Sequence, residues 1–77
     1  MNNLLNRIEI NPKIMLGKPV IKGTRIPVEI ILKKLAQNIS IREILNDYPK
    51  LIEKDIKSAI AFASEELSTE EIYVLAK

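Results

Sequence analysis

The sequence contains no cysteine and no histidine. Without cysteine, neither disulfide bonds nor thiolate metal sites can reinforce the fold. Without histidine, the usual general acid–base group near neutral pH is missing, and serine–histidine or cysteine–histidine nucleophiles are excluded. Zinc sites built from cysteine and histidine are excluded as well. We therefore expect no catalytic residue, no metal and no cofactor, and a protein that is not an enzyme.

Glycine is also scarce, and the two glycines do not form a phosphate-binding loop. Five residues separate Gly17 from Gly23, and Lys22 precedes the second glycine, whereas that loop requires Gly-Lys-Ser/Thr. Clustered acids remain at Glu65, Glu66, Glu70 and Glu71. Neighbouring acids on a helix point in different directions, so a solvated helix face is favoured over a cation site.

Long apolar runs are absent, which argues against a transmembrane helix, and residues 1–10 lack the apolar core of a signal peptide. The lack of cysteine is consistent with the cytoplasm, where we expect the protein to be located. A chain of 77 residues is expected to form a single domain. Its core is near the lower limit for independent stability, and a homodimer would help to bury enough apolar surface.

Net charge is small, at +2, but it is unevenly distributed. Residues 1–27 carry five basic side chains and one acidic one, whereas residues 28–77 carry seven basic and nine acidic ones. The basic part suits nucleic acid and the acidic part suits a basic partner. An asymmetry of this size is also common in proteins that bind neither.

Residues 1–27 read as an N-terminal β arm or hairpin. Ile8 and Ile10 alternate with Glu9 as in a half-buried strand, and residues 20–22 form a second short strand. Asn11-Pro12 and residues 17–19 favour turns between them.

Residues 28–67 have the periodicity of three helices. Pro27 suits the first position of the first helix, and Asn38 suits the left-handed position at its end. Ser40 and Glu43 form a capping box that starts a short second helix, which Pro49 ends.

The third helix is expected over residues 52–67. The apolar side chains at helical spacing are expected to form its buried face, and they are Ile52, Ile56, Ala59, Ile60, Ala63 and Leu67. A further capping box at residues 68–71 predicts a separate helical tail within residues 68–77.

The links between the three helices, residues 38–39 and 49–51, are short and force the helices to cross steeply. We therefore expect a mainly α fold, a homeodomain-like helix-turn-helix core with an N-terminal β arm. Helix three would then be the recognition helix. The candidate DNA-binding residues are polar positions on the arm, around the turn and on the outward face of helix three: Lys18, Lys22, Arg25, Arg42, Lys50, Lys54, Lys57 and Ser58. Glu53 and Asp55 oppose this role because they repel phosphates.

The string from Gly17 to Val28, followed by Ser40-x-x-Glu43-Ile44-Leu45 and Tyr48-Pro49-x-Leu51, resembles the domain-of-unknown-function family number 433. The resemblance covers roughly residues 7–64. It implies a homeodomain-like three-helix fold and small prokaryotic proteins, many of them proposed antitoxins paired with nuclease-like toxins. Such antitoxins bind their own promoter as dimers and block the toxin with another segment.

Three positions depart from the family pattern. Leu16 and Asn38 stand where glycine is usual, and Ile52 stands where the third helix often has a threonine N-cap. Loss of such a cap typically costs about 1 kcal/mol.

Two functions stay open from the sequence. The first is a transcription-regulating antitoxin that binds its own promoter DNA and a toxin protein. The second is an interaction module that binds a toxin-like partner without binding DNA, through the acidic residues Glu65, Glu66, Glu70 and Glu71.

Overall fold

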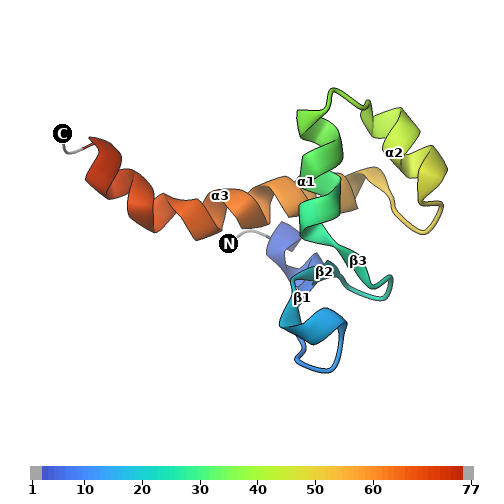
Figure 1. Ribbon diagram of the computed structural model, residues 1–77, viewed down its shortest axis with the longest axis horizontal. Helices are drawn as coiled ribbons and strands as arrows, with labels where there is room; N and C mark the ends of the chain where they lie inside the picture. The colour runs from blue at the N-terminus through green and yellow to red at the C-terminus, as the bar shows by residue number, and fades with distance from the viewer. Residues whose placement is uncertain (1–2, 76–77) are drawn as a thin grey trace.

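A computed structural model describes residues 3–75 of the chain and the side chains of residues 4–68. Three helices follow a small three-stranded antiparallel sheet, and the protein is mostly helical. The sheet lies at one end of α1, and α1 crosses the long helix α3, which projects away from the rest of the molecule (Figure 1). None of the helices within residues 3–75 is long and apolar enough to cross a membrane.

The sheet consists of three strands of two residues each: β1 (Ile8–Glu9), β2 (Val20–Ile21) and β3 (Ile26–Pro27). The 3-10 turns η1 (Asn3–Arg7) and η2 (Met15–Gly17) accompany them. The predicted hairpin is confirmed for residues 8–9 and 20–21, with Ile8 opposite Ile21, whereas Ile10 and Lys22 lie outside the strands. The third strand was not predicted. Pro27 is extended, with φ −66° and ψ 140°, so it belongs to β3 and the helix begins one residue later than expected.

The turn η2 holds three successive residues in the left-handed region. Met15, Leu16 and Gly17 have φ values of 51°, 57° and 85°. This conformation is easy for glycine but costs roughly 1–2 kcal/mol per L-residue. Leu16 is 95% exposed, so its side chain recovers little of that cost by packing. The position where the family pattern has glycine is therefore a position of backbone strain.

Replacing Leu16 with glycine is expected to raise the free energy of unfolding by about 0.5–1 kcal/mol. The left-handed strain is removed, and the extra backbone entropy of glycine in the unfolded chain offsets only part of the gain. Chemical denaturation followed by circular dichroism measures the change. Lys13→Gly is the matched control, because Lys13 is exposed in the preceding loop and is not among the residues with positive φ, so glycine relieves no strain there. An L16G protein no more stable than the wild type or than K13G would contradict the prediction.

The first two helices follow the local sequence rules. Helix α1 spans Val28–Ala36, and Asn38 follows it with φ 65°, as predicted. Helix α2 spans Ile41–Asp47 and begins with the predicted capping box, in which the Glu43 N–H donates to Ser40 Oγ at 3.1 Å and the Ser40 N–H donates to Glu43 Oε1 at 3.4 Å.

Helix α3 spans Glu53–Leu75 without interruption, which corrects two expectations. No separate helix begins at Ser68, because α3 continues through Leu75 and the Ser68 hydroxyl donates to the Glu65 carbonyl at 2.9 Å. The last two residues of the predicted tail, 76–77, lie outside the described residues. Ile52 lies just before the helix and not within it. The links between helices, residues 37–40 and 48–52, are longer than expected.

The core lies where β2 and the three helices meet. Its buried side chains are Ile21, Val28, Ile31, Ile44, Leu51, Ile56 and Ala59. The face of α3 that packs here differs from the expected one. Ile52, Ile60 and Leu67 are exposed, at 48%, 47% and 61%, whereas Asp55 and Ser58 are buried. The second half of α3 leaves the core, so apolar periodicity there does not indicate burial within the chain.

Candidate functional site

The turn between β2 and β3 carries two of the candidate DNA-binding residues, Lys22 and Arg25. The Thr24 hydroxyl fixes this turn, since it donates to the Ile21 carbonyl at 2.8 Å and accepts from the Ile26 N–H at 3.0 Å. Gly23 and Arg25 take positive φ values of 83° and 62°. The turn therefore holds its two basic residues at defined positions, and both side chains are exposed.

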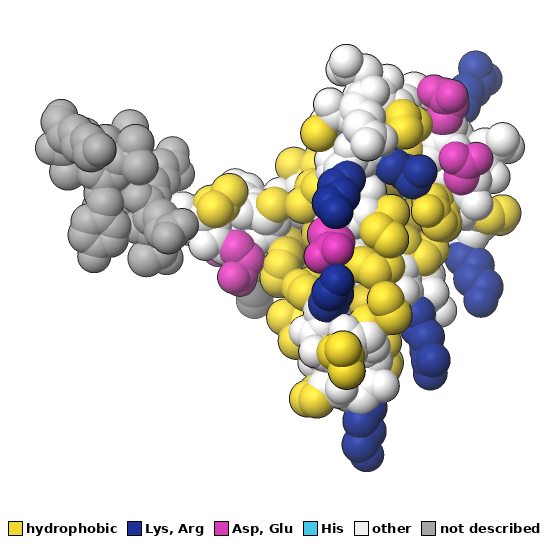
Figure 2. All heavy atoms as spheres, viewed as in Figure 1, with side chains coloured by type: hydrophobic (Ala, Val, Ile, Leu, Met, Phe, Trp, Pro, Cys, Tyr) yellow, Lys and Arg dark blue, Asp and Glu magenta, His cyan; other side chains and the backbone are white. Residues whose placement is uncertain are grey.

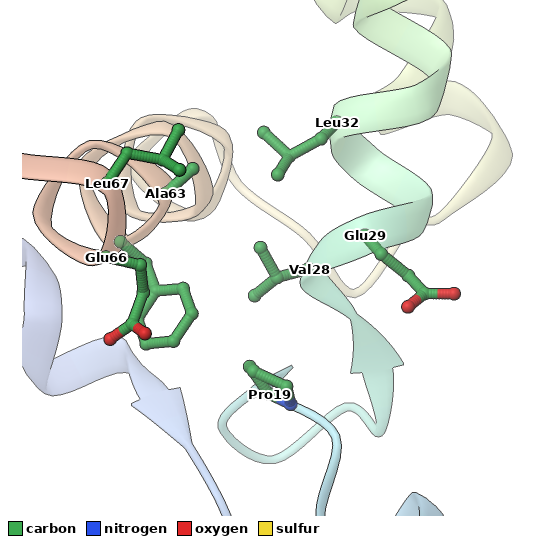
Figure 3. A pocket seen from close by; sticks show the side chains of 8 residues that line it. Pro19, Val28, Glu29, Leu32, Ala63, Glu66 and Leu67 are labelled. Atoms are coloured by element: carbon green, nitrogen blue, oxygen red, sulfur yellow. The ribbon is translucent and has the colours of Figure 1, made fainter. Parts of the chain in front are cut away.

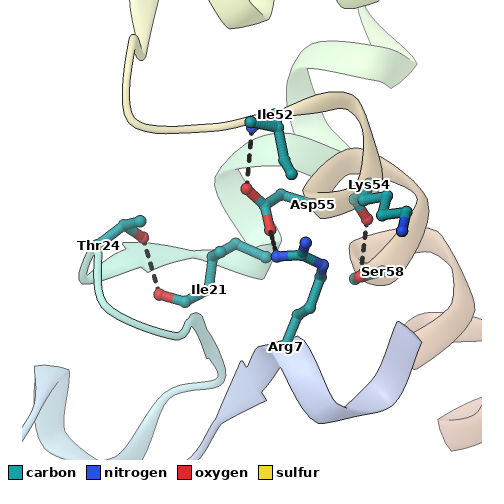
Figure 4. A network of polar contacts seen from close by, with 7 residues as sticks. All are labelled: Arg7, Ile21, Thr24, Ile52, Lys54, Asp55 and Ser58. Atoms are coloured by element: carbon teal, nitrogen blue, oxygen red, sulfur yellow. Dashed lines mark hydrogen bonds and ion pairs between the residues drawn. The ribbon is translucent and has the colours of Figure 1, made fainter. Parts of the chain in front are cut away.

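Asp55 fastens the beginning of α3 to the N-terminal segment. Its carboxylate accepts from the Ile52 N–H at 2.9 Å and from the Arg7 guanidinium at 3.3 Å (Figure 4). Asp55 is 3% exposed, whereas the Arg7 side chain is 37% exposed. The expectation that Asp55 repels phosphates is wrong for this reason: its charge is buried and paired.

The same contact supplies the carboxylate half of a capping box at the beginning of α3. Asp55 is the third residue of α3, and a carboxylate at this position accepts the N–H of the residue before the helix, which is half of a capping box. The half that a Ser or Thr hydroxyl supplies is absent at Ile52.

Replacing Ile52 with threonine is expected to complete the capping box. Ile52→Val is the matched control, because valine and threonine have the same shape and lose the same packing relative to isoleucine. The threonine variant is expected to be more stable than the valine variant by about 1 kcal/mol in urea unfolding. Equal midpoints for the two variants would show that the Asp55 contact alone satisfies the beginning of α3.

The β2–β3 turn and the beginning of α3 lie on either side of Asp55 (Figure 4). Ile21 of β2 packs in the same core cluster as Leu51 and Ile56, which bracket the start of α3. Lys22 and Arg25 belong to the turn that follows Ile21, Lys50 and Lys54 lie next to Leu51 and Ile56 in the chain, and all four side chains are exposed. We call these four residues the basic end.

The remaining basic candidates lie apart from the basic end or only at its border. Lys57 is exposed one turn further along α3, and Arg42 is exposed in the first turn of α2. Lys18 is paired with Glu29 of α1 at 3.3 Å, with both side chains half-exposed. Figure 2 shows Lys and Arg side chains at separate points across the body of the molecule, with apolar surface between them.

Ser58 corrects the list of DNA-binding candidates. It is fully buried, and its hydroxyl donates to the Lys54 carbonyl at 2.7 Å. A hydroxyl in this position cannot reach a base or a phosphate. The helical period placed Ser58 outward because Ile60 and Leu67 were assumed to lie inward, and the actual face of α3 is rotated away from them.

The acidic candidates lie on the projecting half of α3. Glu65 and Glu66 are exposed. Glu70 and Glu71 lie within the helix, but their side chains fall outside residues 4–68, for which the structure describes side chains. Within that described range no group of three or more acidic side chains is placed to hold a metal ion.

Two grooves flank α3 at Phe62 and Glu66. The first has a volume of about 360 Å³ and opens between α3 and α1 (Figure 3). Its lining is largely apolar and comprises Pro19, Val28, Glu29, Leu32, Phe62, Ala63, Glu66 and Leu67. The second, about 400 Å³, lies between α3 and the N-terminal segment and is lined by Leu5, Ile8, Ile10, Phe62, Glu65 and Glu66.

Sequence reasoning missed Arg7 and Asp55 as the pair that positions the basic end. The available signal was the spacing of Asp55 three residues after Ile52, which is the spacing of a capping box without its hydroxyl. Nothing in the sequence connected Asp55 with Arg7, which lies 48 positions away.

The comparisons with known proteins agree with this architecture. A solved DUF433 member from Anabaena variabilis superposes with a TM-score of 0.73 at 29% identity, over 94% of this chain and 70% of that one. An uncharacterised protein from Archaeoglobus fulgidus is 60% identical over 25 residues, which are 32% of this chain and 69% of that protein. The family model for proteins of unknown function, DUF433, matches residues 8–63. The chain therefore belongs to the DUF433 family.

Proposed function

We propose that this protein is a DNA-binding regulator of the antitoxin type, which binds DNA upstream of its own gene as a homodimer and also binds a nuclease-like toxin. One observation carries the proposal. The four cations of the basic end are exposed, and they come from two distant segments that share the core cluster of Ile21, Leu51 and Ile56. Cations beside a helix N-terminus, whose own dipole is positive there, make a surface that suits phosphates.

In this proposal α2 and α3 act as a homeodomain-like helix-turn-helix, with the first turns of α3 in the major groove. Lys54 and Lys57 reach the DNA from the helix, and the β2–β3 turn contacts the backbone alongside it. Arg42 and Lys50, on either side of the link between the two helices, add backbone contacts. The protein needs no catalytic residue or cofactor for this role, and we place it in the cytoplasm.

The experiment is fluorescence anisotropy on labelled DNA from upstream of the gene, repeated at rising salt. Specific binding with a log–log salt slope of several units is expected, because each neutralised phosphate releases counterions. Scrambled DNA of the same length and composition is the control. Equal weak binding to both DNAs, or no binding, would contradict the proposal.

A second candidate is an interaction module that binds a toxin-like protein and no DNA. The observation in its favour is the projecting half of α3, which exposes Glu65 and Glu66 beside two grooves, the first of them largely apolar. Co-purification with the product of a neighbouring gene tests it. In this case the double variant Glu65→Lys/Glu66→Lys is expected to lose the partner, and the K22A/R25A variant is expected to keep it.

A further inference from the structure

The groove between α1 and α3 combines a largely apolar lining with carboxylates at its border. Its volume is about 360 Å³. Val28 and Leu32 point into the open space from α1 (Figure 3). Ala63 and Leu67 face them from α3. A space of this size, lined mainly by apolar side chains with a few polar groups, is typical of sites for small molecules.

Two carboxylates border this groove, and they differ in how their charge is compensated. Glu29 accepts from Lys18 Nζ at 3.3 Å, and its carboxylate points away from the open space (Figure 3). Glu66 lies on the α3 wall and forms no ion pair within residues 4–68, the range over which side chains are described. The negative charge beside the apolar lining is therefore mainly that of Glu66.

The sequence of α3 adds to this negative charge. No basic residue lies between Lys57 and Lys77, whereas four glutamates lie in this stretch. Phe62 also lines the groove, and the face of an aromatic ring attracts a cation. A molecule that carries a positive charge on an apolar body therefore matches both properties of the groove.

We propose that this groove binds a small apolar organic cation, such as an ammonium ion attached to an aromatic or alkyl group. The apolar group lies between Leu32 and Leu67, where binding removes apolar surface of both molecules from water. The ammonium group lies beside Glu66 and Phe62. None of the four residues of the basic end lines this groove, so the ligand site goes beyond the DNA-binding function and does not depend on it.

The extent of the groove favours a small molecule over a protein partner. Eight residues line it, whereas a stable protein interface uses about 20–30 residues on each side. The charge favours a cation over a neutral or anionic molecule, because the desolvated part of Glu66 then gains a partner of opposite sign.

The first test is a titration of the full chain with phenylbutylammonium and with phenylbutyrate, followed by NMR of the backbone amides. The two probes carry opposite charges on nearly the same apolar group. The cation is expected to bind roughly tenfold more tightly, because Glu66 attracts it and repels the anion. The net charge of +2 on the chain would favour the anion, so a preference for the cation reports the local charge. Equal affinities, or no binding of the cation, would overturn the proposal.

The second test separates two neighbouring carboxylates. Glu66→Gln removes the charge at the groove, and Glu65→Gln removes the same charge one residue earlier, where the side chain lines only the second groove. Both side chains are exposed, so both variants are expected to fold. E66Q is expected to weaken binding of the cation about fivefold, and E65Q less than about twofold. Equal losses in the two variants, or a larger loss in E65Q, would contradict the assignment of the site.

The position of the probe is read from the same spectra and from a pair of variants that differ in the space left in the groove. Amide shifts are expected at Val28 and Leu32 and not at Leu5, which lines the second groove. Ala63→Phe fills the first groove and is expected to abolish binding, whereas Ala61→Phe places the same ring on α3 at a residue that lines neither groove. Shifts confined to the second groove, or equal binding by A63F and A61F, would overturn the proposal. Binding of a basic protein segment here without binding of the small cation would do the same.

Discussion

The Asp55→Ala variant is expected to lose about 3 kcal/mol of unfolding free energy, a large part of the stability of a chain this small. Asp55 is 3% exposed and satisfies both the Ile52 N–H and the Arg7 guanidinium. Its removal leaves the partly buried Arg7 guanidinium and the Ile52 N–H without a partner. Unpaired groups of this kind account for most of the loss in unfolding free energy. Urea unfolding followed by circular dichroism measures it.

Glu53→Ala is the matched control for this variant. Glu53 lies in the same first turn of α3 and is exposed, so its removal is expected to change stability by less than about 0.5 kcal/mol. The double variant Arg7→Met/Asp55→Ala is expected to lose less than the two single variants together, because the charge that D55A leaves unpaired is gone. Similar losses for D55A and E53A would show that the Arg7–Asp55 contact does not hold the fold together.

Local rules predicted the elements whose contacts are local. The capping box of Ser40 and Glu43 and the left-handed Asn38 depend on residues three or four positions apart, and the structure has both. The strands at residues 8–9 and 20–21 pair as alternation and turn residues indicated. The family resemblance also named Leu16 as a departure, and the positive φ at this position gives the physical reason.

Local rules could not predict which face of α3 packs against the core. Apolar periodicity places Ile60 and Leu67 inward, but a residue is buried only where another element covers it, and the second half of α3 leaves the core. The first half of α3 buries the carboxylate of Asp55, because Arg7, which is distant in sequence, compensates its charge. Pairing over such a separation has no signature in a single sequence.

The candidate site also has a part that the sequence predicts and a part that it does not. Exposure of the lysines and arginines follows from their chemistry and was predictable. The approach of the β2–β3 turn to the beginning of α3 was not, because it depends on the shared core of Ile21, Leu51 and Ile56 and on the Arg7–Asp55 contact. The first groove likewise arises from the spacing of α1 and α3, and the second from the position of the N-terminal segment beside α3.

The double variant Lys22→Ala/Arg25→Ala is expected to weaken binding to the upstream DNA by roughly tenfold to a hundredfold at physiological salt. Two phosphate contacts are lost, so the log–log salt slope is expected to fall by about 2. The fold is expected to be unchanged, because both side chains are exposed and the Thr24 hydroxyl, which fixes the turn, is retained. Anisotropy titrations at several salt concentrations measure both quantities.

The control removes the same amount of charge elsewhere. Lys13 lies in the loop before η2 and Lys33 lies in the last turn of α1; both are exposed and neither belongs to the basic end. Lys13→Ala/Lys33→Ala is therefore expected to keep nearly the full salt slope, although its net charge equals that of the test variant. Equal losses in the two variants would mean that DNA responds to the overall charge of the protein and not to the turn beside α3. A loss confined to K22A/R25A would instead assign the phosphate contacts to the β2–β3 turn. Because the Asp55 contact positions this turn beside α3, D55A is then also expected to bind the DNA more weakly in conditions where it remains folded.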